Sequence, residues 1–442
     1  MTYKSNITPE SVIPTIREHL IGDGFEFVLD LEKSHGSFMH DALSGRDLLD
    51  FYTCFASNPV GFNHPKLKDR GTLDRLRIAA INNITSSDLF TDLKAEFVKT
   101  FFAKAAPSYM PHLFMIAGGA LAVENALKAS FDWKAKKNLM MGETRQLDLK
   151  VLHFKRAFHG RSGYTMSITN TERGKTELFP KFDWPRIENA MIKFPDEGKN
   201  HVEMLGREKL AIDQLNHAIL THGNSLAAFI IEPIQGEGGD NHFRTEFLTQ
   251  IQTICNDNDI MFIIDEIQSG MGLTGKMWAF EHHGLKPDMI CFGKKAQVCG
   301  FLASKRIDEV EDNVFKTSGR INSTWGGNLI DMVRCQRYLE IIEEDNLLAN
   351  AAEMGKYMLN KLQQIQDKYE GIISNVRGRG LMCAFDVITP DKRDELRNKA
   401  FDESVFILPC GTNSIRFRPP LTINSQEIDQ AAAVIDKVVA SL

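Results

Sequence analysis

The sequence reads AAFII at residues 227–231 and IMFII at residues 260–264, two short runs without a polar residue. Between them, apolar residues stand at 247, 248, 251, 254 and 255, the i, i+1, i+4, i+7, i+8 spacing of one helix face. Strands that are apolar throughout are typical of parallel sheets with both faces covered. The segment therefore predicts a strand, a helix and a second, parallel strand joined by a right-handed crossover.

The flanking sequence extends this pattern. From residue 67 to 331, helical patterns alternate with short apolar runs, which predicts a large α/β domain. Residues 1–66 contain short predicted strands that are too few to form a domain alone, so they need a partner elsewhere in the chain. Residues 332–442 change to long amphipathic helices followed by short strands, which predicts a smaller α+β domain.

The composition argues against several classes of protein. Lysine and arginine total 52 against 58 aspartates and glutamates, and the resulting charge of −6 gives no overall attraction to nucleic acid or anionic membranes. The seven cysteines are scattered and form no Cys-x-x-Cys pair, which argues against a disulfide framework and a structural metal site. No signal-peptide or membrane-span pattern is found, so we expect a cytoplasmic protein that binds no metal.

Charged residues follow three of the predicted apolar strands. Glu232 and Asp265 follow the two runs quoted above, and Lys294 and Lys295 come after the run MICF at 289–292. Ligands of open α/β sheets bind at the carboxyl ends of strands, although either acid could instead cap the turn that follows it. Burial lowers the pKa of a lysine to a range useful for a nucleophile or a base. This arrangement suits a Schiff base between a lysine and pyridoxal phosphate (PLP), with Asp265 for the cofactor ring nitrogen.

A phosphate site is expected where small residues enter a helix. Residues 117–120 read AGGA before a helical pattern, and the free N–H groups of a helix N-terminus bind anions. A second glycine-rich stretch, GMGLTGK at 270–276, has the spacing of a nucleotide-binding P-loop. However, Met277 replaces the Ser or Thr that holds Mg²⁺, and the acidic strand precedes the loop. The P-loop interpretation is therefore rejected.

Seven motifs together resemble the class III (ω-amino acid) aminotransferases over essentially the whole chain. They stand in the family's order: GGALAVEN at 118–125, FHGR at 158–161, EPIQGEGG at 232–239, DEIQ at 265–268, FGKK at 292–295, STWGGN at 323–328 and IRF at 415–417. The resemblance implies PLP as cofactor and the α/β fold called PLP-dependent transferase fold type I. In that fold a large domain, here 67–331, has a mostly parallel seven-stranded sheet covered by helices. A smaller α+β domain comes from both chain ends, here 1–66 and 332–442.

The resemblance also implies the residues that contact the cofactor. Lys294 lies 29 residues after Asp265, as in the family, and would form the Schiff base and carry a proton; Lys295 is the alternative. Asp265 would pair with the ring nitrogen, Gln268 would face the phenolic oxygen, and Phe158 and Ile267 would enclose the ring. The other implied contacts are Glu232, the phosphate-binding Gly119 and Ala120, and Thr324, which would reach the phosphate of the neighbouring subunit.

Substrate-binding residues follow from the same resemblance. Arg416 would bind the α-carboxylate of 2-oxoglutarate, and Glu237 would pair with Arg416 while the amino donor occupies the site. Alternation along the strand places Arg418 on the same face, so only the family motif selects Arg416. Arg161 would hold the carboxylate at the far end of either substrate, and Gln268 would also contact substrate.

Within the family the chain is most similar to members that act on the ε-amine of lysine. This implies amino transfer from L-lysine to 2-oxoglutarate, giving L-2-aminoadipate 6-semialdehyde and L-glutamate, in a homodimer with shared active sites. Ornithine and 4-aminobutyrate are alternative donors, because enzymes that use them share nearly all these motifs. Less favoured alternatives are a PLP aminomutase, which has no need of the Arg416–Glu237 pair, and a non-catalytic relative, which the intact Lys294 argues against.

Overall fold

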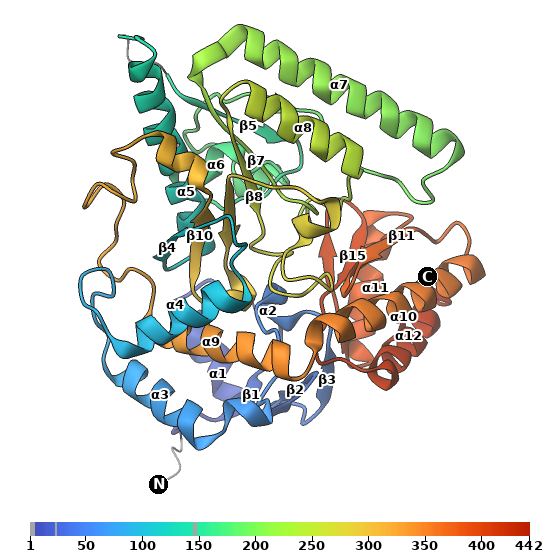
Figure 1. Cartoon of the computed structure of the whole chain (residues 1–442). Coiled ribbons are helices and arrows are strands. Elements are labelled where there is room, and N and C mark those ends of the chain that lie inside the picture. Colours follow the sequence, from blue (N-terminus) through green and yellow to red (C-terminus); the bar gives the residue numbers. More distant parts are fainter. Residues whose placement is uncertain (1–4, 23, 145–147) are drawn as a thin grey trace.

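A seven-stranded sheet lies at the centre of the molecule (Figure 1). The computed structural model describes residues 5–22, 24–144 and 148–442. Read across the sheet, the strands are β4 (His112–Ile116), β10 (Cys299–Ala303), β9 (Met289–Phe292), β8 (Met261–Asp265), β7 (Leu226–Ile231), β5 (Lys150–Phe154) and β6 (Arg186–Ile187). Neighbouring strands from β9 to β6 are parallel, and β10 is antiparallel to β9 and β4. The predicted mostly parallel seven-stranded sheet is confirmed.

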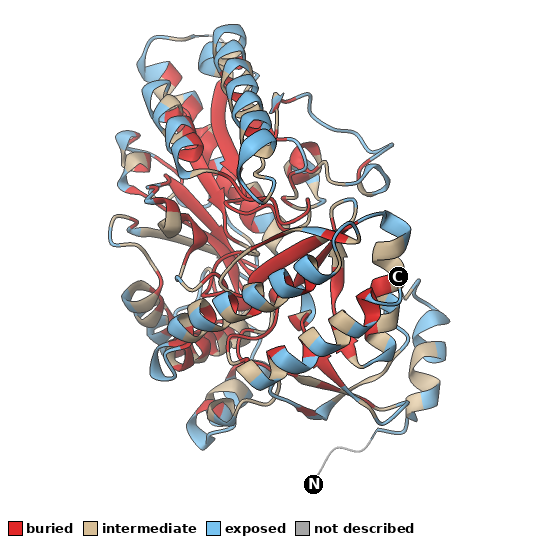
Figure 2. Ribbon diagram, turned by 90° about the vertical axis from the view of Figure 1, so that its right-hand side faces the viewer, coloured by how far each residue is buried: buried red, intermediate tan, exposed pale blue. Residues whose placement is uncertain are grey.

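Helices cover both faces of this sheet. Three of them are α5 (Gly119–Met140), α7 (Gly198–His222) and α8 (Thr245–Asp257). Alternate residues of β8 point to opposite faces, so Phe262 and Ile264 cluster with α7 and α8, whereas Met261 and Ile263 cluster with α5. Figure 2 shows the strands as a buried layer between helices with exposed outer faces. Burial on both faces explains why the sequence of β8 is apolar up to Asp265.

The predicted strand–helix–strand unit is present as β7, α8 and β8. The apolar helix face is buried through Phe247, Leu248, Ile251 and Cys255. Ile231 of β7 pairs with Ile264 of β8 in a parallel register. The acids that follow these two strands therefore reach the same edge of the sheet, as the sequence predicts.

Both chain ends contribute to a smaller part of the fold. One four-stranded sheet contains β1 (Leu29–His35), β2 (Phe38–Asp41), β3 (Asp47–Asp50) and β13 (Val405–Phe406). β3 pairs in parallel with β13, so the N-terminal strands find their partner near the C-terminus. A second sheet has the order β11 (Ile373–Arg379), β12 (Met382–Val387), β15 (Ser414–Phe417) and β14 (Leu408–Cys410).

Further helices complete the two parts of the chain. They are α1 (Pro9–Arg17), α2 (Thr53–Ala56), α3 (Arg70–Ile81), α4 (Asp92–Lys104), α6 (Gly163–Ile168), α9 (Leu329–Glu344), α10 (Leu347–Lys368), α11 (Pro390–Asp402) and α12 (Ser425–Val439). α12 begins with a capping box, in which Asn424 and Glu427 each accept a hydrogen bond from the other's backbone N–H at 3.0 Å. Such reciprocal bonds satisfy donors that a helix N-terminus leaves free.

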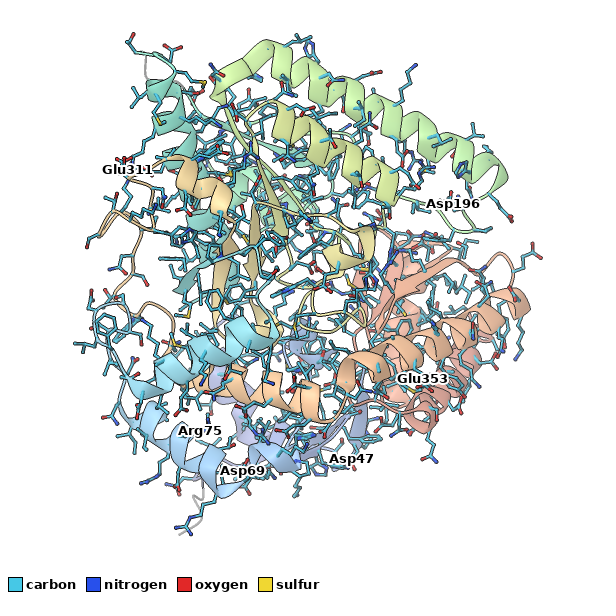
Figure 3. The ribbon with its side chains drawn as sticks, viewed as in Figure 1. Asp47, Asp69, Arg75, Asp196, Glu311 and Glu353 are labelled. Carbon is cyan, nitrogen blue, oxygen red and sulfur yellow. The ribbon has the colours of Figure 1, made fainter. Side chains whose placement is uncertain are left out.

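Charged side chains lie mainly at the periphery, as the labelled Asp47, Asp196, Glu311 and Glu353 illustrate (Figure 3). None of the helices in the described ranges combines the length and the apolar character that a membrane crossing requires. The buried charged residues are therefore the informative ones, because burying an ion without a partner is costly.

Candidate active site

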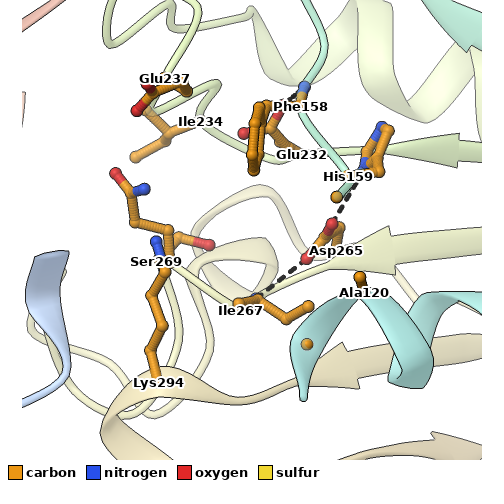
Figure 4. Close-up of a pocket in the computed structure, with 13 residues that line it drawn as sticks. Ala120, Phe158, His159, Glu232, Ile234, Glu237, Asp265, Ile267, Ser269 and Lys294 are labelled. Carbon is orange, nitrogen blue, oxygen red and sulfur yellow. Dashed lines mark hydrogen bonds and ion pairs between the residues drawn. The ribbon is translucent and has the colours of Figure 1, made fainter. Parts of the chain in front are cut away.

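A cavity of about 260 Å³ lies at the carboxyl ends of β7, β8 and β9. The residues that line it come from five segments of the chain: Gly119, Ala120, Phe158, His159, Gly160, Glu232, Ile234, Glu237, Asp265, Ile267, Gln268, Ser269 and Lys294. Figure 4 shows Lys294 extending into the cavity from one side and Asp265 lying on the wall beside the N-terminus of α5. Motifs far apart in the sequence thus meet in one hollow.

Asp265 is held in place by two hydrogen bonds. Its Oδ2 lies 2.8 Å from Nδ1 of His159, and its Oδ1 accepts from the backbone N–H of Ile267 at 3.1 Å (Figure 4). A carboxylate only accepts, so the imidazole proton resides on Nδ1 of His159. Both side chains are buried. The negative charge of Asp265 is therefore presented in a fixed orientation, which suits a partner that carries a buried N–H⁺ group.

Glu232 lies beside Asp265 but has a different environment. Its two oxygens accept hydrogen bonds from the backbone N–H groups of Phe158 at 2.9 Å and Gly236 at 3.2 Å. Burial and the nearby charge of Asp265 raise the pKa of Glu232 well above its ordinary value. Glu232 therefore links the 158–161 loop to the 236–240 loop on the wall of the cavity.

Lys294 begins a short 3₁₀ turn, η5 (Lys294–Ala296), directly after β9 and Gly293. Its φ of 48° is in the left-handed region, which costs a residue with a Cβ about 1 kcal/mol or more. Burial, assisted by the Arg416 guanidinium, lowers the pKa of Lys294 to about 8. A free amine is therefore accessible near neutral pH, as a nucleophile or a proton carrier requires.

The neighbouring Lys295 is directed elsewhere. Its Nζ donates to the backbone carbonyl of Gln268 at 2.6 Å and to that of Ala56 at 3.2 Å. Burial and the adjacent Lys294 lower the pKa of Lys295 well below its ordinary value. Lys295 is not among the residues that line the described cavity. The left-handed turn at Lys294 therefore separates the doublet into one side chain in the cavity and one in the protein interior.

The N-terminus of α5 supplies a cradle for an anion. Gly118 precedes the helix with a φ of 101°, and no side-chain cap is present in this described segment. A Cβ on Gly119 would lie 3.2 Å from Ile267 Cδ1. A Cβ on Gly160 would lie 2.6 Å from the Cβ of Ala120, at a φ of 121°. Small residues thus keep the helix N–H groups accessible, and these groups and the helix dipole favour a phosphate there.

Glu237 is held by two cations at the cavity wall. Its Oε2 lies 2.9 Å from Nη1 of Arg416, and its Oε1 lies 2.7 Å from Nζ of Lys175. Burial alone would raise the pKa of Glu237, but Arg416 and Lys175 lower it to about 2. Burial alone would lower the pKa of Arg416, but the carboxylate of Glu237 holds it above its ordinary value. The carboxylate and the guanidinium are therefore both charged at neutral pH.

Arg418, which the strand pattern left equivalent to Arg416, has different partners. β15 ends at Phe417, so Arg418 lies beyond the strand. Its Nη2 forms an ion pair with Asp240, and its Nη1 donates to the carbonyl of Phe417 at 2.8 Å. These contacts use Arg418 to fix the loop that carries Glu237, whereas Arg416 faces the cavity through Glu237.

Comparison with known proteins decides the family. A family model described as "Aminotransferase class-III" matches residues 23–439. This chain is a class III aminotransferase. An L-lysine-epsilon aminotransferase from Mycobacterium tuberculosis is 46% identical over 97% of this chain and 95% of its own length. Human mitochondrial 4-aminobutyrate aminotransferase is 32% identical over 95% of this chain and 86% of its own length.

The fold of this class III aminotransferase is also found in solved structures. A lysine aminotransferase from M. tuberculosis, solved "in the internal aldimine form", has a TM-score of 0.96 and 45% sequence identity. The similarity covers 98% of this chain and 99% of that chain. The family uses PLP, and the fold expected from the sequence motifs is confirmed.

Most of the predicted site residues of the aminotransferase line the cavity. Those that do are Gly119, Ala120, Phe158, Glu232, Glu237, Asp265, Ile267, Gln268 and Lys294. Arg416 reaches the cavity through its ion pair with Glu237. Arg161 and Thr324 are exposed and are not part of the lining of the described cavity. Their assigned roles remain predictions.

Sequence reasoning missed three participants. His159 is part of the FHGR motif, but the sequence does not predict its hydrogen bond with Asp265, which lies 106 residues later. Ser269 follows the DEIQ motif and lines the cavity. Lys175 lies in the 3₁₀ turn η2 (Arg173–Lys175), far from any motif, and contacts Glu237 across 62 residues. For Lys175 the sequence contains no signal, because isolated lysines in polar loops are usually solvated.

Proposed function

We propose that this chain transfers the ε-amino group of L-lysine to 2-oxoglutarate. The products are L-2-aminoadipate 6-semialdehyde, which cyclises to piperideine-6-carboxylate, and L-glutamate. The ion pair of Arg416 with Glu237 beside Lys294 is the observation that carries the proposal. Support for the donor comes from the relatives, since L-lysine-epsilon aminotransferases are 45–47% identical to this chain and a 4-aminobutyrate aminotransferase is 32% identical.

The Arg416–Glu237 pair solves the problem of two different substrates in one cavity. An ω-amine brings no carboxylate to the reacting end, so Arg416 needs another anion while L-lysine is bound. Glu237 supplies that anion at 2.9 Å. The keto acid brings a carboxylate next to its reacting carbon, and this group takes the place of Glu237 on Arg416. The same cavity can therefore accept both substrates in turn.

The residues of the cavity fit PLP. The cradle at Gly119 and Ala120 suits its phosphate, the fixed carboxylate of Asp265 suits its protonated ring nitrogen, and Lys294 suits its aldehyde. Phe158 and Ile267 lie on the cavity wall, where side chains could enclose a flat ring, and Gln268 faces the same space. When bound, PLP supplies an electron sink that stabilises the negative charge left on the substrate carbon.

The chain's own groups move the proton and orient the substrate. The Nζ of Lys294, whose pKa is about 8, would take the proton from the substrate carbon that bears the amine and hold it within the site for the next step. Asp265 keeps its charge aligned through His159 and the N–H of Ile267. Arg161 would hold the far carboxylate, the α-carboxylate in the case of L-lysine.

Thr324 suggests that the active form is a homodimer. It lies in the exposed segment that includes Trp325, whose side chain is 43% exposed. Thr324 is exposed and does not line the described cavity of its own chain, so its hydroxyl is accessible to another subunit, as the family motif implies. We therefore propose that Thr324 completes the phosphate site of a second subunit. We also propose a cytoplasmic location, in which the seven free cysteines of the structure would stay reduced.

The proposed function is tested with the PLP-loaded protein and single substrates. L-lysine added without a keto acid should remove the visible absorbance band of the bound cofactor, and 2-oxoglutarate should restore it. The product of full turnover should then form a coloured adduct with 2-aminobenzaldehyde, which reports the cyclised semialdehyde. If ornithine or 4-aminobutyrate removes the band but L-lysine leaves it unchanged, L-lysine is not the amino donor. If 2-oxoglutarate is not converted to glutamate, the reaction is that of an aminomutase.

Replacing Glu237 should separate the two halves of the reaction. In Glu237→Ala, the guanidinium of Arg416 is left without its anion while L-lysine is bound. We expect the rate constant of the lysine half-reaction to fall by roughly 10- to 100-fold, because an unpaired buried charge is costly. The 2-oxoglutarate half-reaction should change by about threefold at most, because the substrate itself pairs with Arg416. Equal losses in stopped-flow measurements of both halves would contradict the exchange.

A further inference from the structure

The carboxylate of Glu237 has a cation on each side. Arg416 contacts Oε2 at 2.9 Å and Lys175 contacts Oε1 at 2.7 Å. The two bonds use different oxygens, so either can break while the other remains. Rearrangement of the site on substrate exchange therefore does not require Glu237 to lose all its partners at once.

Lys175 is itself positioned by the protein. Its Nζ also lies 2.8 Å from Glu172 Oε1 and 5.6 Å from the centre of the Phe158 ring. The two carboxylates raise the pKa of Lys175 above its ordinary value in spite of partial burial. The ammonium is thus a fixed positive charge at the rim of the cavity, next to a ring that lines it.

The backbone that carries Glu237 is held rigidly. The carbonyl of Glu237 accepts from the N–H of Gly411 at 2.9 Å. Arg377 donates from Nε to the carbonyl of Asp240 at 3.0 Å and from Nη2 to that of Gly239 at 2.5 Å. A Cβ on Gly238 would lie 2.2 Å from the carbonyl oxygen of Arg156, so the loop is also tightly packed. Displacement of Glu237 is therefore confined to its side chain.

A displaced Glu237 needs a partner within reach of its side chain. When a keto acid carboxylate occupies Arg416, the bond from Oε2 is lost and the carboxylate of Glu237 would otherwise be left partly buried and unpaired. Lys175 already contacts its other oxygen, and no other lysine or arginine among the described residues forms an ion pair with Glu237. Lys175, the cation with which the displaced Glu237 pairs, is therefore already in contact with it before a keto acid replaces Glu237 on Arg416.

We propose that Lys175 is a positioning residue that holds Glu237 in its displaced state, and so permits Arg416 to bind the keto acid. The inference rests on the proposed function, since it concerns the second half of that reaction. Lys175 then affects the two substrates to different extents. With L-lysine bound, Glu237 pairs with both Arg416 and Lys175, whereas with 2-oxoglutarate bound it pairs with Lys175 alone. Loss of the ammonium should therefore weaken keto acid binding selectively.

The test compares Lys175→Met with the wild-type holoenzyme in both half-reactions. We expect the dissociation constant of 2-oxoglutarate to rise by about 10-fold, the effect of losing one charged hydrogen bond, and that of L-lysine to change by less than about threefold. Binding of unreactive glutarate, measured by titration calorimetry, should weaken by a similar factor. Lys175→Arg should restore binding. Lys181→Met is the matched control, because Lys181 belongs to the same segment but donates to the carbonyl of Thr176.

A double variant isolates the coupling between the two side chains. In a Glu237→Gln background, residue 237 has no carboxylate that could pair with Lys175. Lys175→Met should therefore change the dissociation constant of 2-oxoglutarate by less than about threefold. Equal weakening of both substrates in Lys175→Met would instead assign Lys175 to their shared far carboxylate and overturn the proposal. An unchanged constant for 2-oxoglutarate would overturn it too. A wild-type enzyme that fails with L-lysine or 2-oxoglutarate would refute the proposed function itself, which is a separate outcome.

Discussion

Lys294→Ala is expected to abolish turnover, with a loss on the order of 10⁴-fold or more, because it removes both the amine that bonds to the cofactor and the group that carries the proton. The PLP-loaded variant should also lack the visible absorbance band of the wild-type enzyme. Small amines such as ethylamine, which fit the space left by the side chain, should restore part of the proton transfer. Rate and spectrum are measured together, so that loss of cofactor is distinguished from loss of the proton carrier.

Lys295→Met provides the control for this prediction. Lys295 donates to two backbone carbonyls in the interior, so its loss should lower the melting temperature. The absorbance band should remain, because Lys295 does not line the cavity. The opposite pattern, with a normal band in Lys294→Ala and none in Lys295→Met, would transfer the catalytic assignment to Lys295.

The sequence predicted the parts of the fold that repeat a pattern. Apolar strands covered on both faces have a composition that is readable without a structure, so β7, α8, β8 and β9 were located within about two residues. The acids and the lysine that follow these strands were placed correctly at one edge of the sheet, because parallel strands end together.

Choices between neighbouring residues needed the structure. The Lys294–Lys295 doublet is resolved by a φ of 48° at Lys294, a backbone conformation that residue type does not reveal. Strand alternation places Arg416 and Arg418 on the same face. However, β15 ends at Phe417, between them, and Arg418 forms an ion pair with Asp240. In both cases the backbone at the end of a strand decides which of the two side chains is directed toward the cavity or toward a residue that lines it.

Contacts across long sequence separations were beyond prediction from one sequence. Lys175 reaches Glu237 only because the fold brings η2 next to the 236–240 loop. Nothing in the composition of residues 173–175 distinguishes this turn from an ordinary solvated loop.

Asp265→Asn should lower turnover by roughly 100- to 1,000-fold while leaving the fold intact, because it removes a preorganised charge without changing the size of the side chain. The amide oxygen can still accept from the N–H of Ile267, and the imidazole of His159 can adopt its other tautomer to accept from the amide N–H₂. We therefore expect little change in melting temperature. The loss should appear in the rate constants of both half-reactions, since both need a protonated ring nitrogen.

The adjacent Glu266 is the matched control for Asp265. It is buried directly after the same strand and does not itself line the described cavity. Its carboxyl accepts from Ser269 Oγ at 2.6 Å and from the N–H of Phe280 at 2.8 Å. Burial raises the pKa of Glu266 to about 7, so at neutral pH it is already partly neutral and Glu266→Gln imitates its protonated form. That variant should keep turnover within a few-fold of wild type. If Asp265→Asn behaved in the same way, Asp265 would be no more than a cap for the turn at Ile267, and the charge required at the cofactor ring would have to come from another residue.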